Sequence, residues 1–146
     1  MASPLKQFEI KTIWPLEAYG IDISFTNSSL AMLVTVFLIL IFMFFGLRNA
    51  SIIPTKGQSL LEMSYEFIAE MIGDNIGKEG MRYFSFVFTL FLFILLGNLI
   101  GMFPYSFTWT SHIIVTFAIA FFIFLAVTLI AIMKHGIVKF LKFFAP

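Results

Sequence analysis

The side chains that could do chemistry are few and lie far apart. There is no cysteine, and the two histidines, His112 and His135, would be about 34 Å apart along a helix, too far to bind one haem within a chain. The sequence contains no phosphate-binding glycine loop, no nucleophile beside a base, and no group of acids or histidines at metal-ligand spacing. We therefore expect no catalytic residue, no metal site and no cofactor in this chain.

One amide side chain stands out within the long apolar stretches. Asn98 is the most polar residue of the runs 30–47, 83–103 and 113–133, none of which contains a charged residue. An asparagine in a membrane helix either bonds to a neighbouring helix or faces a water-filled path, and both interpretations stay open. Beside it, Gly97 and Gly101 form a G-x-x-x-G step, which predicts the close approach of another helix. The other hydrogen-bonding residues of these runs are Thr35, Tyr83, Ser85, Thr89, Thr116 and Thr128.

His112 lies at the start of the third apolar run. Histidine titrates near neutral pH, so an imidazole at this position could exchange protons with external water. A lone histidine at a membrane interface can equally have a structural role, and the residue alone leaves both interpretations open.

The elements that must position these residues are membrane helices. Of the 146 residues, 60% are hydrophobic and 12% are charged, so the chain has more apolar surface than a soluble domain of this length can bury. About 20 apolar residues cross the roughly 30 Å hydrocarbon layer as a helix. We predict an all-α membrane protein with transmembrane helices at 30–47, 83–104 and 112–134, in contact with the lipid bilayer. A net charge of +1 provides no basic surface for nucleic acid.

The second and third predicted spans form a hairpin whose link, residues 104–112, is short and uncharged. Pro104 lacks the N–H that a continuing helix would need. Tyr105 and Trp109 are residue types that favour the membrane–water interface. We therefore expect the chain to turn at a membrane surface, with Trp109 at the interface.

Residues 58–76 are predicted to form an amphipathic helix parallel to the membrane. Ser59 and Glu62 have the spacing of a capping box, which predicts that the helix starts there. Four acids recur at i, i+4 steps on one face, and we call them the acidic stripe: Glu62, Glu66, Glu70 and Asp74. The stripe is either a solvated face or a docking surface for a basic partner subunit. The apolar residues expected on the opposite face are Leu60, Leu61, Phe67, Ile68, Met71 and Ile72.

The distribution of lysine and arginine predicts the orientation. The segment 48–82 carries four such residues, the tail 135–146 with Lys134 carries three, the segment 1–29 carries two, and the link carries none. Because positively charged short loops stay in the cytoplasm, we expect the segment 1–29 and the link outside, and the helix 58–76 and the interfacial tail 135–146 inside. The first 27 residues lack the apolar core of a secretory signal peptide, so no shortened N-terminus is expected.

Several local sequences carry a resemblance to a known family. They are PLKQFEI at residues 4–10, FTNSSL at 25–30, FVFTLF at 86–91, GNLIGMFPYSFT at 97–108, SHIIVT at 111–116 and KHG at 134–136. On these residues the chain resembles the N-terminal part of subunit a of the F-type ATP synthase in its bacterial form. The resemblance covers essentially the whole sequence.

The resemblance implies a membrane stator subunit that carries protons past a rotating c-subunit ring through two offset half-channels, coupling proton flow to ATP synthesis. It implies that Asn98 lines the outer half-channel and that His112 and Thr116 lie near its mouth. It also implies that the acidic stripe lies where the b subunits of the peripheral stalk meet the membrane. The implied location is the bacterial inner membrane, with a periplasmic N-terminus. By resemblance, the chain is a subunit of the complex and not an enzyme by itself.

The family's essential arginine lies on the first of two long tilted helices, which the resemblance places beyond residue 146. Arg48 and Arg82 lie at the boundaries of apolar runs and do not replace it. We therefore expect that the sequence is either a portion of a longer protein or a truncated gene product, and that these residues alone do not move protons across a membrane.

Two other functions fit the residues alone. The first is a non-catalytic three-span anchor that holds soluble subunits at the membrane through the acidic stripe. The second is a haem or quinone membrane subunit, against which the spacing of the two histidines argues unless two chains share one haem.

Overall fold

The computed structural model describes residues 9–18, 21–22, 24–48, 52–103, 106–137, 140 and 142. Several residues used in the sequence predictions lie outside this described part, namely 4–8, Pro104, Tyr105, Lys139 and 143–146. The chain divides into two compact units, residues 1–109 and 110–146, and each is described by itself.

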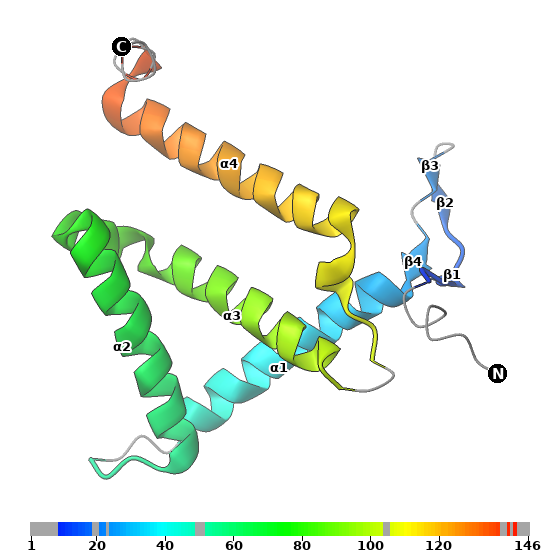
Figure 1. Ribbon diagram of the computed structural model, residues 1–146, viewed down its shortest axis with the longest axis horizontal. Helices are drawn as coiled ribbons and strands as arrows, with labels where there is room; N and C mark the ends of the chain where they lie inside the picture. The colour runs from blue at the N-terminus through cyan, green and yellow to red at the C-terminus, as the bar shows by residue number, and fades with distance from the viewer. Residues whose placement is uncertain are drawn as a thin grey trace. The chain divides into compact units, whose positions relative to one another are not determined.

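Four α-helices dominate the described residues (Figure 1). They are α1 (Asn27–Arg48), α2 (Lys56–Ile76), α3 (Phe84–Gly101) and α4 (Ile113–His135), with 3₁₀ helices η2 (Lys78–Tyr83) and η3 (Trp109–Ser111). Among the described residues, three helical segments are long and apolar enough to cross a membrane: α1, η2 with α3, and α4. At the standard rise, the 22 residues of α1 cover about 33 Å. The predicted all-α membrane fold class is confirmed.

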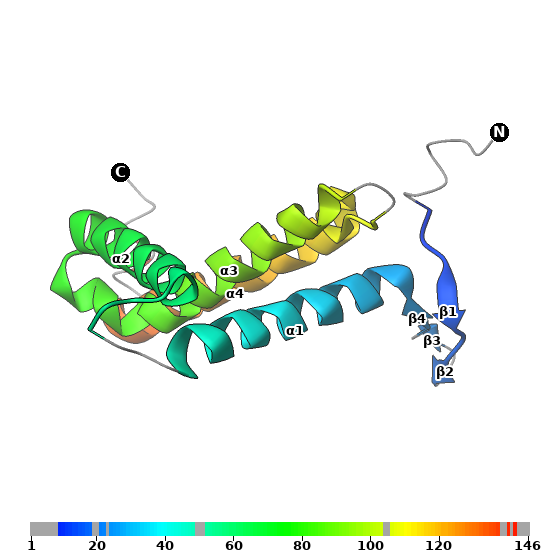
Figure 2. The ribbon, with the colours of Figure 1, turned by 90° about the horizontal axis from the view of Figure 1, so that it is seen from below.

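The segment before α1 contains short strands that were not predicted from the sequence. Strand β1 (Thr12–Trp14) pairs antiparallel with β4 (Phe25–Thr26), and β2 (Glu17–Ala18) pairs with β3 (Ile21–Asp22). Figure 2 shows the strands at the N-terminal end of α1. Strands of two or three residues are too short for a visible alternation of apolar and polar residues, which explains the omission.

Asn27 joins this segment to α1. Its backbone N–H donates to the carbonyl oxygen of Lys11 at 3.0 Å, and its Oδ1 accepts from the Lys11 N–H at 3.0 Å. Its Nδ2 donates to the carbonyl oxygen of Glu9 at 2.9 Å. The cap of α1 lies one residue earlier, because Thr26 Oγ1 accepts from the Ser29 N–H at 3.4 Å. The helix therefore begins three residues before the predicted Leu30.

The predicted capping box at Ser59 and Glu62 is wrong. The N-cap of α2 is Thr55, whose side chain accepts from the Gln58 N–H at 3.5 Å. Gln58 Nε2 in turn donates to Glu62 Oε1 at 2.8 Å. The same Ser/Thr-x-x-Glu/Gln pattern occurs at Thr55 and Gln58, and the helix extends back to this earlier match, so that Ser59 lies inside the first turn.

We expect Thr55→Ala to lower the free energy of unfolding by about 0.5–1 kcal/mol, in the lower part of the range for cap removal because the hydrogen bond is long. Ser59→Ala is the matched control and should cost nothing, since alanine is the better helix former inside a turn. Detergent-solubilised variants followed by circular dichroism during SDS titration would measure both. An equal loss for the two variants would contradict the assigned cap.

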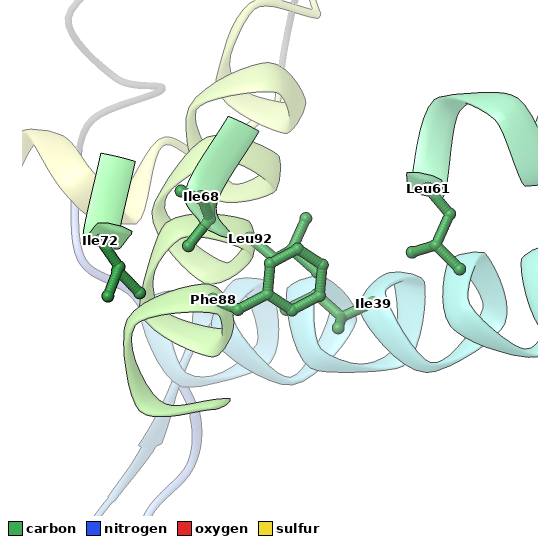
Figure 3. Packing of buried hydrophobic residues seen from close by; sticks show 6 residues of the cluster. All are labelled: Ile39, Leu61, Ile68, Ile72, Phe88 and Leu92. Atoms are coloured by element: carbon green, nitrogen blue, oxygen red, sulfur yellow. The ribbon is translucent and has the colours of Figure 1, made fainter. Parts of the chain in front are cut away.

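The core of the first unit is formed where α1, α2 and α3 pack together (Figure 3). Its buried apolar residues are Ile39 from α1, Leu61, Ile68 and Ile72 from α2, and Phe88 and Leu92 from α3. Close packing of α1 against α2 depends on Gly46, because a Cβ at this position would lie 2.7 Å from Leu61 Cδ2. Helix α2 therefore packs against both neighbouring helices and is not an isolated surface helix.

The apolar face predicted for α2 divides into two rows. Leu61, Ile68 and Ile72 are buried in the core. Leu60 and Phe67, by contrast, are 56% and 55% exposed. The sequence periodicity could not separate a row covered by other helices from a row left open, because both consist of apolar residues at helical spacing. The helix ends at Gly77, whose positive φ of 79° suits glycine and whose N–H donates to the Gly73 carbonyl at 3.0 Å.

Candidate functional site

Asn98 lies one turn before the C-terminal end of α3, and its side chain is exposed. Its Nδ2 donates to the Ile94 carbonyl oxygen, four residues earlier, at 2.9 Å. The amide thus presents a polar group on the outside of a helix that is otherwise built from apolar residues. Such a group is costly against hydrocarbon, so the arrangement favours contact with water, another helix or a partner subunit.

Other polar side chains of the predicted spans bond to their own helix in the same way. Thr35 Oγ1 donates to the Ala31 carbonyl at 2.8 Å, and Thr89 Oγ1 donates to the Ser85 carbonyl at 2.7 Å. A hydroxyl that donates to the carbonyl four residues earlier is satisfied without a partner helix. This pattern is what an apolar solvent requires, because no water is present to accept the hydrogen bond.

The two glycines beside Asn98, Gly97 and Gly101, face the segment that follows α3. A Cβ at Gly97 would lie 2.7 Å from Cε2 of Trp109 and 2.8 Å from its Nε1, and a Cβ at Gly101 would lie 2.6 Å from Cγ2 of Thr108. Thr108 Oγ1 also donates to the Gly101 carbonyl at 3.3 Å. Among the described residues, the two glycines therefore make room for side chains of the link that follows α3, namely Trp109 and Thr108. The close approach of another helix to these glycines stays a prediction.

Trp109, which the sequence predicts at the level of the membrane interface, is buried within the protein. It is 1% exposed, and its Nε1 donates to Thr35 Oγ1 at 3.2 Å. Its ring lies 4.7 Å from the Phe93 ring, centroid to centroid. The recess at Gly97 and the hydroxyl of Thr35 together explain the burial, because they accommodate both the indole surface and its N–H. We call Thr35, Phe93, Gly97 and Trp109 the Trp109 cluster.

The sequence did not predict the Trp109 cluster. It joins α1, α3 and the link, and it contains Thr35, the only hydroxyl of the first predicted span. Two signals could have suggested it: a lone hydroxyl in an apolar span, and a tryptophan close in sequence to a small-residue step. The cluster holds the backbone next to Asn98, because Gly97 belongs to the cluster and directly precedes Asn98 in the sequence.

His112 and Thr116 lie together in the second unit. His112 is the N-cap residue of α4, and its carbonyl oxygen accepts from the Thr116 N–H at 3.1 Å and from Thr116 Oγ1 at 3.2 Å. These bonds make the first turn of α4. The structure thus brings these two predicted residues together, while Asn98 belongs to the other unit.

The acidic stripe of α2 is exposed along its whole length. Glu62, Glu66, Glu70 and Asp74 follow each other on the side of the helix that faces away from the buried residues Leu61, Ile68 and Ile72. The stripe is therefore available to solvent or to a partner.

No group of three or more histidine, cysteine or acidic residues at metal-binding distance occurs within the described ranges. The exposed amide of Asn98, the Trp109 cluster that supports it and the acidic stripe are thus the features that a function must explain.

Comparisons with known proteins identify one family. The family model described as ATP synthase A chain matches residues 29–146. The chain is 53% identical over 144 residues to the ATP synthase subunit a of Rhodospirillum rubrum, which covers 99% of this chain and 60% of that protein. It is 52% identical over 143 residues to the ATP synthase subunit a of Parvibaculum lavamentivorans, a match that covers 98% of this chain and 55% of that protein. It is 50% identical over 143 residues to the ATP synthase subunit a of Agrobacterium fabrum, a match that covers 98% of this chain and 57% of that protein.

The chain therefore spans between 55% and 60% of the length of these three curated relatives, and nearly all of its own residues take part in each match.

Proposed function

We propose, from the premise that this chain belongs to the ATP synthase A chain family, that it forms part of the membrane stator of an F-type ATP synthase. In this role it contributes to the proton half-channels beside the c-subunit ring and helps to couple proton flow to ATP synthesis. The chain is a multi-pass membrane protein, and the part that the structure describes contains three helical segments able to span the bilayer. It acts as a component of the complex and not as an enzyme by itself.

The observation that carries the ion-path proposal is the exposure of Asn98. An amide on the outside of an apolar membrane helix is stabilised when water reaches it. We propose that Asn98 lines the outer aqueous half-channel and that His112 and Thr116 lie at its mouth. The bond from Thr116 to the His112 carbonyl holds the first turn of α4 in a defined conformation at that mouth.

The orientation in this proposal follows the positive charges. The segment before α1 lies in the periplasm, and α2, between α1 and α3, lies along the cytoplasmic surface of the bacterial inner membrane. In that position the acidic stripe faces the cytoplasmic side, where the b subunits of the peripheral stalk leave the membrane. The c ring and the b subunits are accordingly the proposed partners.

The stripe is tested by charge reversal in the assembled complex. We expect Glu66→Lys combined with Glu70→Lys to weaken retention of the b subunits roughly tenfold, because each exposed ion pair contributes up to about 1 kcal/mol and reversal adds repulsion. Raising the salt concentration should reproduce part of the loss with the native chain. Quantifying the subunits that co-purify with the chain measures the effect.

Glu9→Lys combined with Glu17→Lys is the matched control, since it changes the net charge equally at exposed acids outside the stripe. Equal retention of the b subunits in both double variants would show that the stripe is only a solvated face. Co-purification of soluble subunits without a c ring would favour the anchor function instead.

A further inference from the structure

The segment before α1 leaves more than half of the surface of several apolar side chains exposed. Ile10, Ile13 and Leu16 are 51%, 52% and 54% exposed, and Trp14 is 69% exposed. The five residues 12–16 carry no charge, whereas Lys11 and Glu17 bound them on either side. An uncharged stretch with a tryptophan between charged residues has the composition of a segment that enters the interfacial layer of a membrane.

The strand pairing holds this uncharged stretch close to the start of the first span. In the β1–β4 pair, Thr12 lies opposite Thr26 and Trp14 lies opposite Phe25, with a register shift between the two pairs. Paired strands are about 4.8 Å apart, and α1 begins at the residue after Thr26. Trp14 therefore lies within two residues of the level at which the membrane helix starts. The headgroup layer on each side of the hydrocarbon is about 5–8 Å thick, so this level falls within it.

The uncharged stretch stays near the start of α1 because Asn27 holds the residues directly before it. Asn27 is the first residue of α1, and its backbone and side chain make three hydrogen bonds to Glu9 and Lys11 of the incoming segment. The segment is thus tied to the end of the span at its own base, directly before the uncharged residues.

We propose that residues 10–16 form an interfacial lipid anchor, in which Trp14, Ile13 and Leu16 enter the headgroup–acyl boundary of the leaflet at the N-terminal end of α1. The occupant of this apolar surface is lipid, because the surface is continuous with the start of a membrane helix and Trp14 lies at the depth that tryptophan prefers. The anchor sets the depth at which α1 begins. This inference uses only α1 as a membrane span and does not depend on the proposed role in proton transport.

Tryptophan fluorescence provides the first test, since the chain has two tryptophans. Trp109→Phe leaves Trp14 as the sole emitter in the full chain reconstituted in phosphatidylcholine vesicles. We expect a blue-shifted emission, loss of most of it when the lipid is brominated near the headgroup end of its acyl chains, and little quenching by aqueous iodide. Trp14→Phe is the control, in which the enclosed Trp109 should respond less to the brominated lipid than Trp14 does.

Two outcomes would overturn the proposal. Quenching by iodide without quenching by brominated lipid would place Trp14 in water. Quenching by neither reagent would show that a protein surface, such as a second copy of the chain, covers it.

A second measurement leaves the Trp109 cluster intact. The chain has no cysteine, so Trp14→Cys introduces a single thiol for a spin label, with Glu17→Cys as the matched control three residues away. We expect the label at position 14 to be more accessible to oxygen, which concentrates in lipid, than to a water-soluble nickel chelate. We expect the opposite order of accessibilities for the label at position 17. The same ratio of accessibilities at both positions would overturn the proposal.

Discussion

Trp109→Ala is expected to lower the free energy of unfolding by about 3–5 kcal/mol, the range for removing a large buried aromatic residue. Three contacts are lost together: the packing of the indole in the Gly97 recess, the ring contact with Phe93, and the hydrogen bond to Thr35. SDS titration followed by circular dichroism measures the loss.

Two variants separate the parts of this effect. Trp109→Phe keeps a smaller ring in the recess but removes the N–H donor and part of the indole volume, so a loss of about 1–3 kcal/mol is expected, smaller than that of Trp109→Ala. Thr35 is not left without a partner, because it still donates to the Ala31 carbonyl. Trp14→Ala removes the same residue type from an exposed position and should leave stability in detergent nearly unchanged. A cost for Trp109→Ala no larger than that for Trp14→Ala would contradict the buried cluster.

Gly97→Ala is expected to cost about 1–3 kcal/mol, the usual penalty for overfilling a packed site. The new Cβ would meet the Trp109 indole at separations that real Cβ atoms do not show, so the ring must move. Its movement is opposed by Phe93 and by the hydrogen bond to Thr35. With Trp14→Phe in the background, so that Trp109 is the sole emitter, the thermal midpoint and the emission spectrum should therefore change together.

Gly73→Ala is the control for Gly97→Ala. It also replaces a helical glycine, but a Cβ there meets nothing within 4 Å, so alanine should stabilise α2 by about 0.5–1 kcal/mol. The double variant Gly97→Ala with Trp109→Val tests the contact itself, because the penalty at position 97 should nearly vanish once the indole is gone. Additive losses would show that Gly97 and Trp109 do not interact.

The apolar runs predict much of this fold because they have a strong, local signal. A run such as 30–47, with no charge, admits few structures other than a membrane helix, and the structure places α1 there. The G-x-x-x-G step and Asn98 were also visible in the sequence, and the family resemblance drawn from residues 97–108 is confirmed by the comparisons.

The features that the sequence did not predict depend on contacts between distant residues. The bond from Trp109 to Thr35 joins residues 74 positions apart, and only the packing of α1 against α3 brings them together. The preference of tryptophan for the membrane interface does not predict which protein residues cover it, and here a recess at Gly97 and an acceptor at Thr35 bury the ring. The start of α2 was misplaced because two overlapping capping patterns compete, and local sequence cannot rank them.

The position of Asn98 beside the Trp109 cluster connects stability with the proposed ion path. Gly97 faces the buried indole, while the next residue, Asn98, presents its amide on the exposed side of α3. Successive residues of a helix point about 100° apart, so a helix end held by Trp109 also holds the amide in a fixed direction. A loosened cluster should therefore misplace the polar group as well as destabilise the chain.

The most direct test is the accessibility of position 98 in the assembled complex. Because the chain has no cysteine, Asn98→Cys introduces one thiol, and ATP-driven proton pumping can be measured before and after a small water-soluble thiol reagent is added. Leu92→Cys, at a core position that is 2% exposed, is the control. If Asn98 lines an aqueous half-channel, the reagent will inhibit pumping through Cys at position 98 and not at position 92. A thiol at position 98 that never reacts would contradict the proposed water-lined path.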